Sequence, residues 1–150
     1  MIVYRIANEP FNEDLSGEGA AMYGGRWNSM GVKMIYTAQS ISLTILEALV
    51  HLRIDILPPA QFLLSIEVPD KEIAVVSLEK IKPGWASEVE YTQWIGDQFI
   101  ASGKSLLLQV PSVIIPQEKN ILINPLHKEF KKVKLISTEL FRLDQRLIKV

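Results

Sequence analysis

Alternating apolar and polar residues predict a chain built mainly from short strands. Phe62, Leu64, Ile66 and Val68 share one face of an extended segment, as expected for a strand with one buried side. Less regular patterns of the same kind recur between turn-forming residues. We expect strands over 2–7, 33–38, 62–68, 73–78, 106–110 with 113–115, 120–125, 133–136 and 139–143.

Two segments have the pattern of helices. Residues 41–52 are almost wholly apolar and follow Ser40, which is a favourable N-cap. Residues 89–101 form an amphipathic pattern, and Gly103 is well placed to end that helix. The residues expected to point inward from the second helix are Trp94, Ile95 and Phe99.

Turn-forming segments connect these elements. Residues 8–22 are acidic and rich in turn formers, so we expect a loop there, and Pro58 and Pro59 close the segment after the first helix. A length of 150 residues without internal repeats suits one domain. The expected fold class is α+β: a single compact domain, residues 1–150, of mostly short strands with a few packed helices.

Composition excludes several classes of function. The formal net charge is −1, and the densest basic segment, 128–134, is interrupted by Glu129, so we expect no nucleic-acid partner. The chain has no cysteine, which excludes disulfides, thiolate metal sites and a cysteine nucleophile. No stretch reaches about 18 apolar residues, and the N-terminus does not resemble a signal peptide. We therefore expect a cytoplasmic protein that does not bind membranes.

Three side chains that could bind a substrate or take part in catalysis lie in three consecutive predicted elements. Gly24 and Gly25 allow a tight turn, and Arg26 follows with a planar set of donors that suits phosphate or carboxylate. Tyr36 lies on the next strand and Glu47 on the helix after it. Neighbouring elements of this kind can bring their side chains to one site.

Glu47 belongs to a narrow polar strip on the otherwise apolar helix. At about 100° per residue, the strip contains Thr44, Glu47 and His51. A carboxylate in such a strip faces either a cleft or a buried cation, and structural ion pairs explain many residues of this kind. The pattern leaves both interpretations open.

Pro111 and Ser112 interrupt an apolar run and indicate an irregular turn. A hydroxyl there can point into a pocket, although turn chemistry alone explains many serines beside a proline. No nucleophile elbow surrounds Ser112, so a triad with His51 or His127 is not indicated. Two histidines far apart in sequence also make a histidine-rich metal centre unexpected, and no metal is expected.

Arg26, Tyr36 and Glu47 permit one reaction that needs neither a metal nor a thiol. An arginine suits a diphosphate, an aromatic ring suits a flat heterocycle, and a carboxylate near a sugar hydroxyl suits cleavage of an N-glycosidic bond. That reaction passes through an oxocarbenium-like state, which a carboxylate stabilises.

The chain resembles the RES family over nearly its whole length. The shared motifs, in order, are YRIA, GGRWNSMGVKMIYTAQSISLTILEALVHL, VPSVIIPQEKNILINPLH and FRLDQRL. The family is named for characteristic arginine, glutamate and serine residues, which correspond here to Arg26, Glu47 and Ser112, and Tyr36 matches a further site tyrosine. The resemblance implies a bacterial toxin of a toxin–antitoxin pair, similar in fold to ADP-ribosyltransferases, that depletes NAD.

The resemblance also implies partners and roles. NAD is the expected substrate, with Arg26 on its diphosphate and Tyr36 against the nicotinamide ring or its ribose. Glu47 would stabilise the ribosyl cation, and Ser112 would orient a ribose or phosphate oxygen. The expected partner is an Xre-type helix-turn-helix antitoxin, bound to a homodimer of the toxin.

Further residues are candidates for supporting roles. Arg5 is a second candidate for a phosphate contact, His51 is a candidate for holding Glu47, and Tyr23 is expected to line the pocket. Trp27 is expected to lie in the core.

The acceptor stays open at this stage. Water, inorganic phosphate or a protein side chain would each complete the reaction. The alternatives are an ADP-ribosyltransferase with a specific protein target and a non-catalytic module that binds an antitoxin or another subunit. An RNA-cleaving toxin fits the near-neutral charge less well.

Overall fold

A mixed sheet with packed helices makes up the computed structural model, which describes residues 1–52 and 60–148. The helices are α1 (Glu18–Tyr23), α2 (Ile41–Leu49) and α3 (Val89–Ser102), with short 3-10 helices at Trp85–Ser87, Phe130–Lys132 and Gln145–Ile148. The strands are β1 (Ile2–Asn8), β2 (Ile35–Ala38), β3 (Gln61–Glu67), β4 (Ala74–Val75), β5 (Leu107–Pro111), β6 (Lys119–Ile123) and β7 (Lys134–Phe141). The expected α+β class is confirmed.

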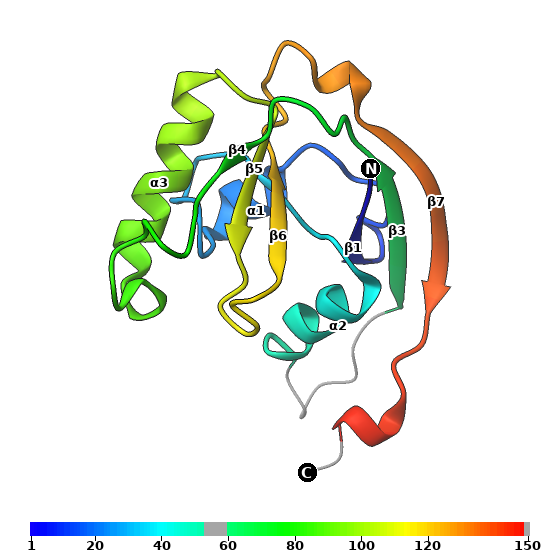
Figure 1. Cartoon of the computed structure of the whole chain (residues 1–150). Coiled ribbons are helices and arrows are strands. Elements are labelled where there is room, and N and C mark those ends of the chain that lie inside the picture. Colours follow the sequence, from blue (N-terminus) through cyan, green and yellow to red (C-terminus); the bar gives the residue numbers. More distant parts are fainter. Residues whose placement is uncertain (53–59, 149–150) are drawn as a thin grey trace.

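Strand order separates the sheet into two groups. The order is β4-β5-β6-β2-β1-β3-β7, with β4 and β5 parallel and the other neighbours antiparallel. Figure 1 shows β4, β5 and β6 on one side of the molecule and β1, β3 and β7 on the other. Helix α3 lies outside the first group, and α2 (cyan) lies below both (Figure 1).

Two hydrophobic cores hold these layers together. The first lies between the two strand groups and contains Val3, Ala7, Ile35, Leu64, Ile66, Val68, Leu106, Leu107, Ile121 and Ile123. The second lies between β5, β6 and α3 and contains Trp27, Met34, Ile81, Trp85, Phe99, Leu108, Val110 and Leu122. Adjacent residues of β6 therefore serve opposite cores, which explains its unbroken apolar sequence.

The local signals for the two expected helices are confirmed at their ends. The Ser40 hydroxyl accepts a hydrogen bond from the Leu43 amide at 3.1 Å and caps α2. Gly103 ends α3 in the left-handed region, with a φ of 59°. Helix α2 ends at Leu49, earlier than expected. The predicted turn at Pro58-Pro59 lies outside the described residues.

Several sequence predictions are wrong, for reasons of packing. The expected loop 8–22 contains the start of α1, which is too short to show a helical period. Residues 113–115 are not a strand, because the Ser112 hydroxyl accepts from the amides of Ile114 and Ile115 and turns the chain. The two strands expected after residue 132 are one strand, β7, because it pairs with β3 along its length.

The prediction that Trp94 points inward is also wrong. Its side chain is 60% exposed, whereas Phe99 is buried as expected. The side of α3 that contains Thr92 and Gly96 packs inward instead, because a loop of the candidate site lies directly against it.

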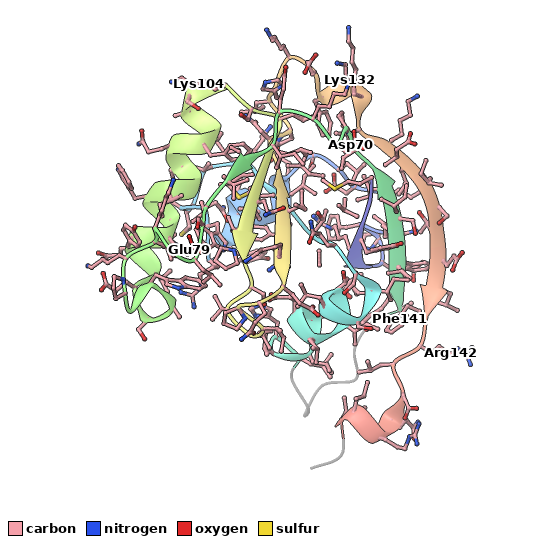
Figure 2. The ribbon with its side chains drawn as sticks, viewed as in Figure 1. Asp70, Glu79, Lys104, Lys132, Phe141 and Arg142 are labelled. Atoms are coloured by element: carbon pink, nitrogen blue, oxygen red, sulfur yellow. The ribbon has the colours of Figure 1, made fainter. Side chains whose placement is uncertain are left out.

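Charged side chains of both signs lie at the periphery. Figure 2 shows Glu79, Lys104 and Lys132 at different edges of the molecule, and all three are exposed. Across residues 1–52 and 60–148, no helix has the length and apolar character needed to span a bilayer.

Candidate active site

A cavity lies where β1 and β2 diverge. These neighbouring strands are paired through Tyr4 and Ala38, whereas β1 pairs with β3 and β2 pairs with β6 along their lengths. The cavity of about 610 Å³ is lined by residues 4–6 of β1, residues 36–38 of β2, the glycine turn and α2. A volume of this size falls in the range of small-molecule and cofactor sites.

The glycine turn forms one wall of the cavity. The Gly25 amide donates to the Asn28 carbonyl at 2.9 Å, which closes a tight four-residue turn. A Cβ atom at Gly25 would lie 2.7 Å from the Tyr36 hydroxyl oxygen and 2.8 Å from Asn28 Oδ1. A side chain at this position would therefore displace the groups that hold the turn.

Tyr36 connects the turn to β2. Its hydroxyl donates to Asn28 Oδ1 at 2.6 Å and accepts from the Trp27 amide at 2.9 Å. Burial raises the pKa of this phenol, and the Asp97 carboxylate adds to the effect, while the Trp27 amide and Arg26 oppose it. The group therefore stays protonated, and its ring remains available to line the cavity.

Helix α3 holds the same loop from outside. Thr92 Oγ1 donates to the Arg26 carbonyl at 2.6 Å, and Gln93 Nε2 donates to the Gly25 carbonyl at 3.0 Å. Asp97 accepts from both the amide and the hydroxyl of Ser29. A Cβ atom at Gly96 would lie 1.6 Å from the Trp27 carbonyl oxygen. Close contact between α3 and the loop thus fixes the position of Arg26.

Glu47 is held on the opposite wall by two donors. Ser112 Oγ donates to Glu47 Oε1 at 2.8 Å, and Asn120 Nδ2 donates to the same oxygen at 2.7 Å. The Ser112 hydroxyl itself accepts from the amides of Ile114 and Ile115, each at 3.1 Å. A hydroxyl that accepts from backbone amides becomes a better donor, so this short chain of bonds holds the Glu47 carboxylate in place.

Two arginines give the cavity positive charge. Arg26 lines it from the glycine turn, and its Nη1 donates to the Ala86 carbonyl at 2.8 Å. Arg5 lines it from β1, and burial lowers the pKa of its guanidinium, an effect that Asp14 partly opposes. Within the described residues, the buried Arg5 Nε has no hydrogen-bond partner. Each guanidinium therefore keeps donors for an anionic group.

The structure brings four of the predicted site residues to the cavity and places two elsewhere. Arg5, Arg26, Tyr36 and Glu47 all line it. Tyr23 does not, because it ends α1 with a side chain that is 79% exposed. Ser112 is fully buried behind Glu47, so it contacts the carboxylate rather than the cavity.

Two further expectations concern residues beside the site. His51 lines the cavity but is exposed, and it is not among the hydrogen-bond partners of Glu47 in the described chain. Trp27 is 2% exposed and lies in the core, as expected. Across the described residues, no three His, Asp or Glu side chains gather as metal ligands would.

Sequence reasoning missed the residues that position the site. Gln93, Asp97 and Asn120 have partners that are distant in sequence, so no local pattern reveals their contacts. The partner of Asn28, Tyr36, is eight positions away, but no periodicity links an irregular turn to a strand. The sequence gives one indication of the contact with α3: the polar residues 92, 93 and 97 and Gly96 lie on one side of the predicted helix. Asn120 comes directly before the apolar residues 121–123 and has the appearance of a turn residue in the sequence, although it lies within β6.

Comparison with solved structures supports the fold. The chain is similar to a chain in the crystal structure of the M. tuberculosis MbcT-MbcA toxin-antitoxin complex, with a TM-score of 0.61 and 18% sequence identity. The match covers 98% of this chain and 86% of that chain. At this identity the similarity concerns the fold alone.

Sequence comparisons cover the whole molecule. The chain is 37% identical to Toxin Res of Photorhabdus laumondii, over 99% of this chain and 98% of that protein. It is 42% identical to the Prs ADP-ribosylating toxin of Sphingobium sp., over 91% of this chain and 88% of that protein. The family model described as RES domain matches residues 2–144. These matches confirm the resemblance seen in the motifs, and the chain belongs to the RES domain family.

Proposed function

We propose that this protein is the toxin of a bacterial toxin–antitoxin pair and that it cleaves the nicotinamide–ribose bond of NAD. The names of its relatives support the first part, since full-length relatives are called Toxin Res. The name of the Sphingobium relative, an ADP-ribosylating toxin, supports NAD as the source of the transferred group.

The arrangement around Glu47 is the observation that carries the proposal. When the bond between ribose C1′ and the nicotinamide nitrogen breaks, the electron pair leaves with neutral nicotinamide and the ribose becomes an oxocarbenium-like cation. A carboxylate fixed by two donors on one oxygen is already oriented to stabilise that charge. Its stabilising effect is larger in a cavity with little water than in solution.

The remaining cavity residues suit the rest of the dinucleotide. Arg5 and Arg26 would bind the diphosphate, for which planar guanidinium donors are well matched. Tyr36 would contribute its ring face to the nicotinamide or its ribose, because its hydroxyl is already bonded on both sides. Ser112 would act through Glu47, since its hydrogen is donated to that carboxylate.

The acceptor decides the product. Water would add to C1′ with loss of one proton and give ADP-ribose, and inorganic phosphate would give a phosphorylated ADP-ribose. Transfer to a protein side chain is the second candidate, and the 42% identity to the Prs ADP-ribosylating toxin favours it specifically. Labelled NAD and a cell lysate would distinguish transfer, which gives one discrete modified protein, from hydrolysis or phosphorolysis, which gives none.

An antitoxin completes the proposal. The related fold occurs in a toxin–antitoxin complex, which supports a protein partner for this chain as well. We propose that the partner is of the Xre helix-turn-helix type and that the toxin is a homodimer within the assembly, located in the cytoplasm. Co-expression with the adjacent gene and measurement of the mass of the complex would test both points.

Release of nicotinamide from NAD by the purified protein, without antitoxin, tests the central claim. Glu47→Gln keeps the size of the side chain but removes its charge, and it should lower the rate about a hundredfold or more. Glu139→Gln, an exposed residue of β7, is the matched control and should keep the wild-type rate.

Three outcomes separate the candidate functions. Equal rates for Glu47→Gln and the wild type would remove Glu47 from the mechanism. Toxicity on expression with an unchanged NAD level and no nicotinamide release would favour the non-catalytic binding module. Toxicity with an early fall in NAD would support the proposed reaction.

A further inference from the structure

Asn120 is half-buried and lines the cavity beside an apolar part of the sheet. It lies on β6, between Val110 of β5 and Ala38 of β2. The three residues that follow it in the strand, 121–123, are all buried and apolar. A polar atom that is buried at such a position is costly unless it is hydrogen-bonded.

Only one end of the Asn120 amide has a partner in the described chain. Its Nδ2 donates to Glu47 Oε1 at 2.7 Å, whereas its Oδ1 is buried without a hydrogen bond. The orientation follows from chemistry, because a carboxylate can only accept and must face the NH₂ group. A leucine would avoid the cost of the unpaired oxygen, so stability does not explain the asparagine.

Among the described residues, the donors to Glu47 leave one carboxylate oxygen for the substrate. Ser112 and Asn120 approach Glu47 from β5–β6, and both bind Oε1, so neither uses Oε2. Glu47 lies in the last turn of α2, where the carbonyl end of the helix disfavours a negative charge. The two donors on Oε1 offset this unfavourable interaction and hold the carboxylate in place.

We propose that Asn120 is a positioning residue for Glu47, a role that rests on the proposed cleavage of NAD. Its amide orients the carboxylate so that Oε2 faces the ribose carbon from which nicotinamide leaves. Ser112 provides the second point of attachment, and two attachments define the direction of the carboxylate where one would leave it free to rotate. The unpaired Oδ1 is the structural cost of this arrangement.

Replacement of Asn120 by leucine tests the proposal. Asn120→Leu has a similar size but no donor, and misplacement of a catalytic group by about 1 Å can lower a rate about a hundredfold. We expect kcat for NAD to fall about tenfold to a hundredfold, because the carboxylate acts mainly in the transition state. KM should stay within about threefold of the wild type, and Tm should be equal or higher. A merely structural role would instead lower Tm.

Two controls make the result specific. Gln109→Leu makes a comparable amide-to-leucine change on β5, at a residue outside the cavity, and should leave kcat unchanged. In a Glu47→Gln background, Asn120→Leu should lower the rate by less than about twofold, since a residue that acts through Glu47 has nothing left to orient. If the leucine variant does not fold, Asn120→Ala removes the same donor with less bulk.

The possible failures are distinguishable. An unchanged kcat in a folded Asn120 variant would overturn the positioning role, as would a rise in KM alone or a full additional loss in the Glu47→Gln background. If the wild type releases nicotinamide no faster than Glu47→Gln does, the proposed function fails and the inference fails with it.

Discussion

Replacing Tyr36 by phenylalanine removes one oxygen atom that is bonded on both sides. That oxygen donates to Asn28 Oδ1 at 2.6 Å and accepts from the Trp27 amide at 2.9 Å. Asn28 is fully buried and Trp27 is 2% exposed, so water would not easily replace the lost bonds. Tyr36→Phe therefore leaves two buried polar groups unsatisfied.

The expected cost follows from those two groups. Each buried donor or acceptor left unpaired costs about 1 to 3 kcal/mol, so we expect the free energy of unfolding to fall by about 2 to 6 kcal/mol. For a chain of 150 residues this corresponds to a decrease in Tm of about 5 to 20 °C. Urea unfolding followed by tryptophan fluorescence, together with a thermal scan, would measure both quantities.

A matched control distinguishes the loss of a buried, doubly bonded hydroxyl from the general effect of replacing a tyrosine by phenylalanine. The Tyr91 hydroxyl accepts one long, exposed bond, from the Lys82 amide at 3.4 Å. Tyr91→Phe should therefore change the free energy of unfolding by less than about 0.5 kcal/mol. If Tyr36→Phe is as mild as this control, the hydroxyl does not hold the glycine turn and the description of that wall of the site is wrong.

The pH dependence gives a second measurement on the same variant. Because burial raises the pKa of Tyr36, the folded protein holds the phenolic proton more tightly than the unfolded chain does. The corresponding stabilisation is complete below about pH 10, where free tyrosine begins to ionise, and decreases as the pH rises above that value. The wild type should lose stability above pH 10 more steeply than Tyr36→Phe.

Two further substitutions test how the loop and Arg26 are held. Gly96→Ala places a methyl group against the Trp27 carbonyl and should destabilise the fold by about 3 kcal/mol or more in urea unfolding. The control is Gly19→Ala in α1, which has open space around it and should be neutral or slightly stabilising. Arg26→Lys keeps the charge but cannot serve both the Ala86 carbonyl and a diphosphate, so KM for NAD should rise about tenfold in steady-state kinetics with Tm nearly unchanged. An unchanged KM would show that Arg26 does not contribute to the binding of NAD.

Local patterns in the sequence determined much of the secondary structure. Ser40 and the apolar residues after it specify α2, and Gly103 specifies the end of α3, because helix caps depend on neighbouring residues. The motifs around Arg26, Tyr36 and Glu47 also indicated the family, and these three residues line the same cavity. Their convergence follows from three short elements that are consecutive in the chain.

Tertiary structure alone decided how the site is held. Glu47 is bonded to Ser112 and Asn120, which are 65 and 73 positions away in sequence, and Ser29 is bonded to Asp97, 68 positions away. Periodicity describes which side of an element is apolar, but it does not say which distant element covers that side. For the same reason the pattern placed Trp94 inward, although the inward side of α3 is the one that contains Thr92, Gly96 and Phe99 and meets the glycine turn.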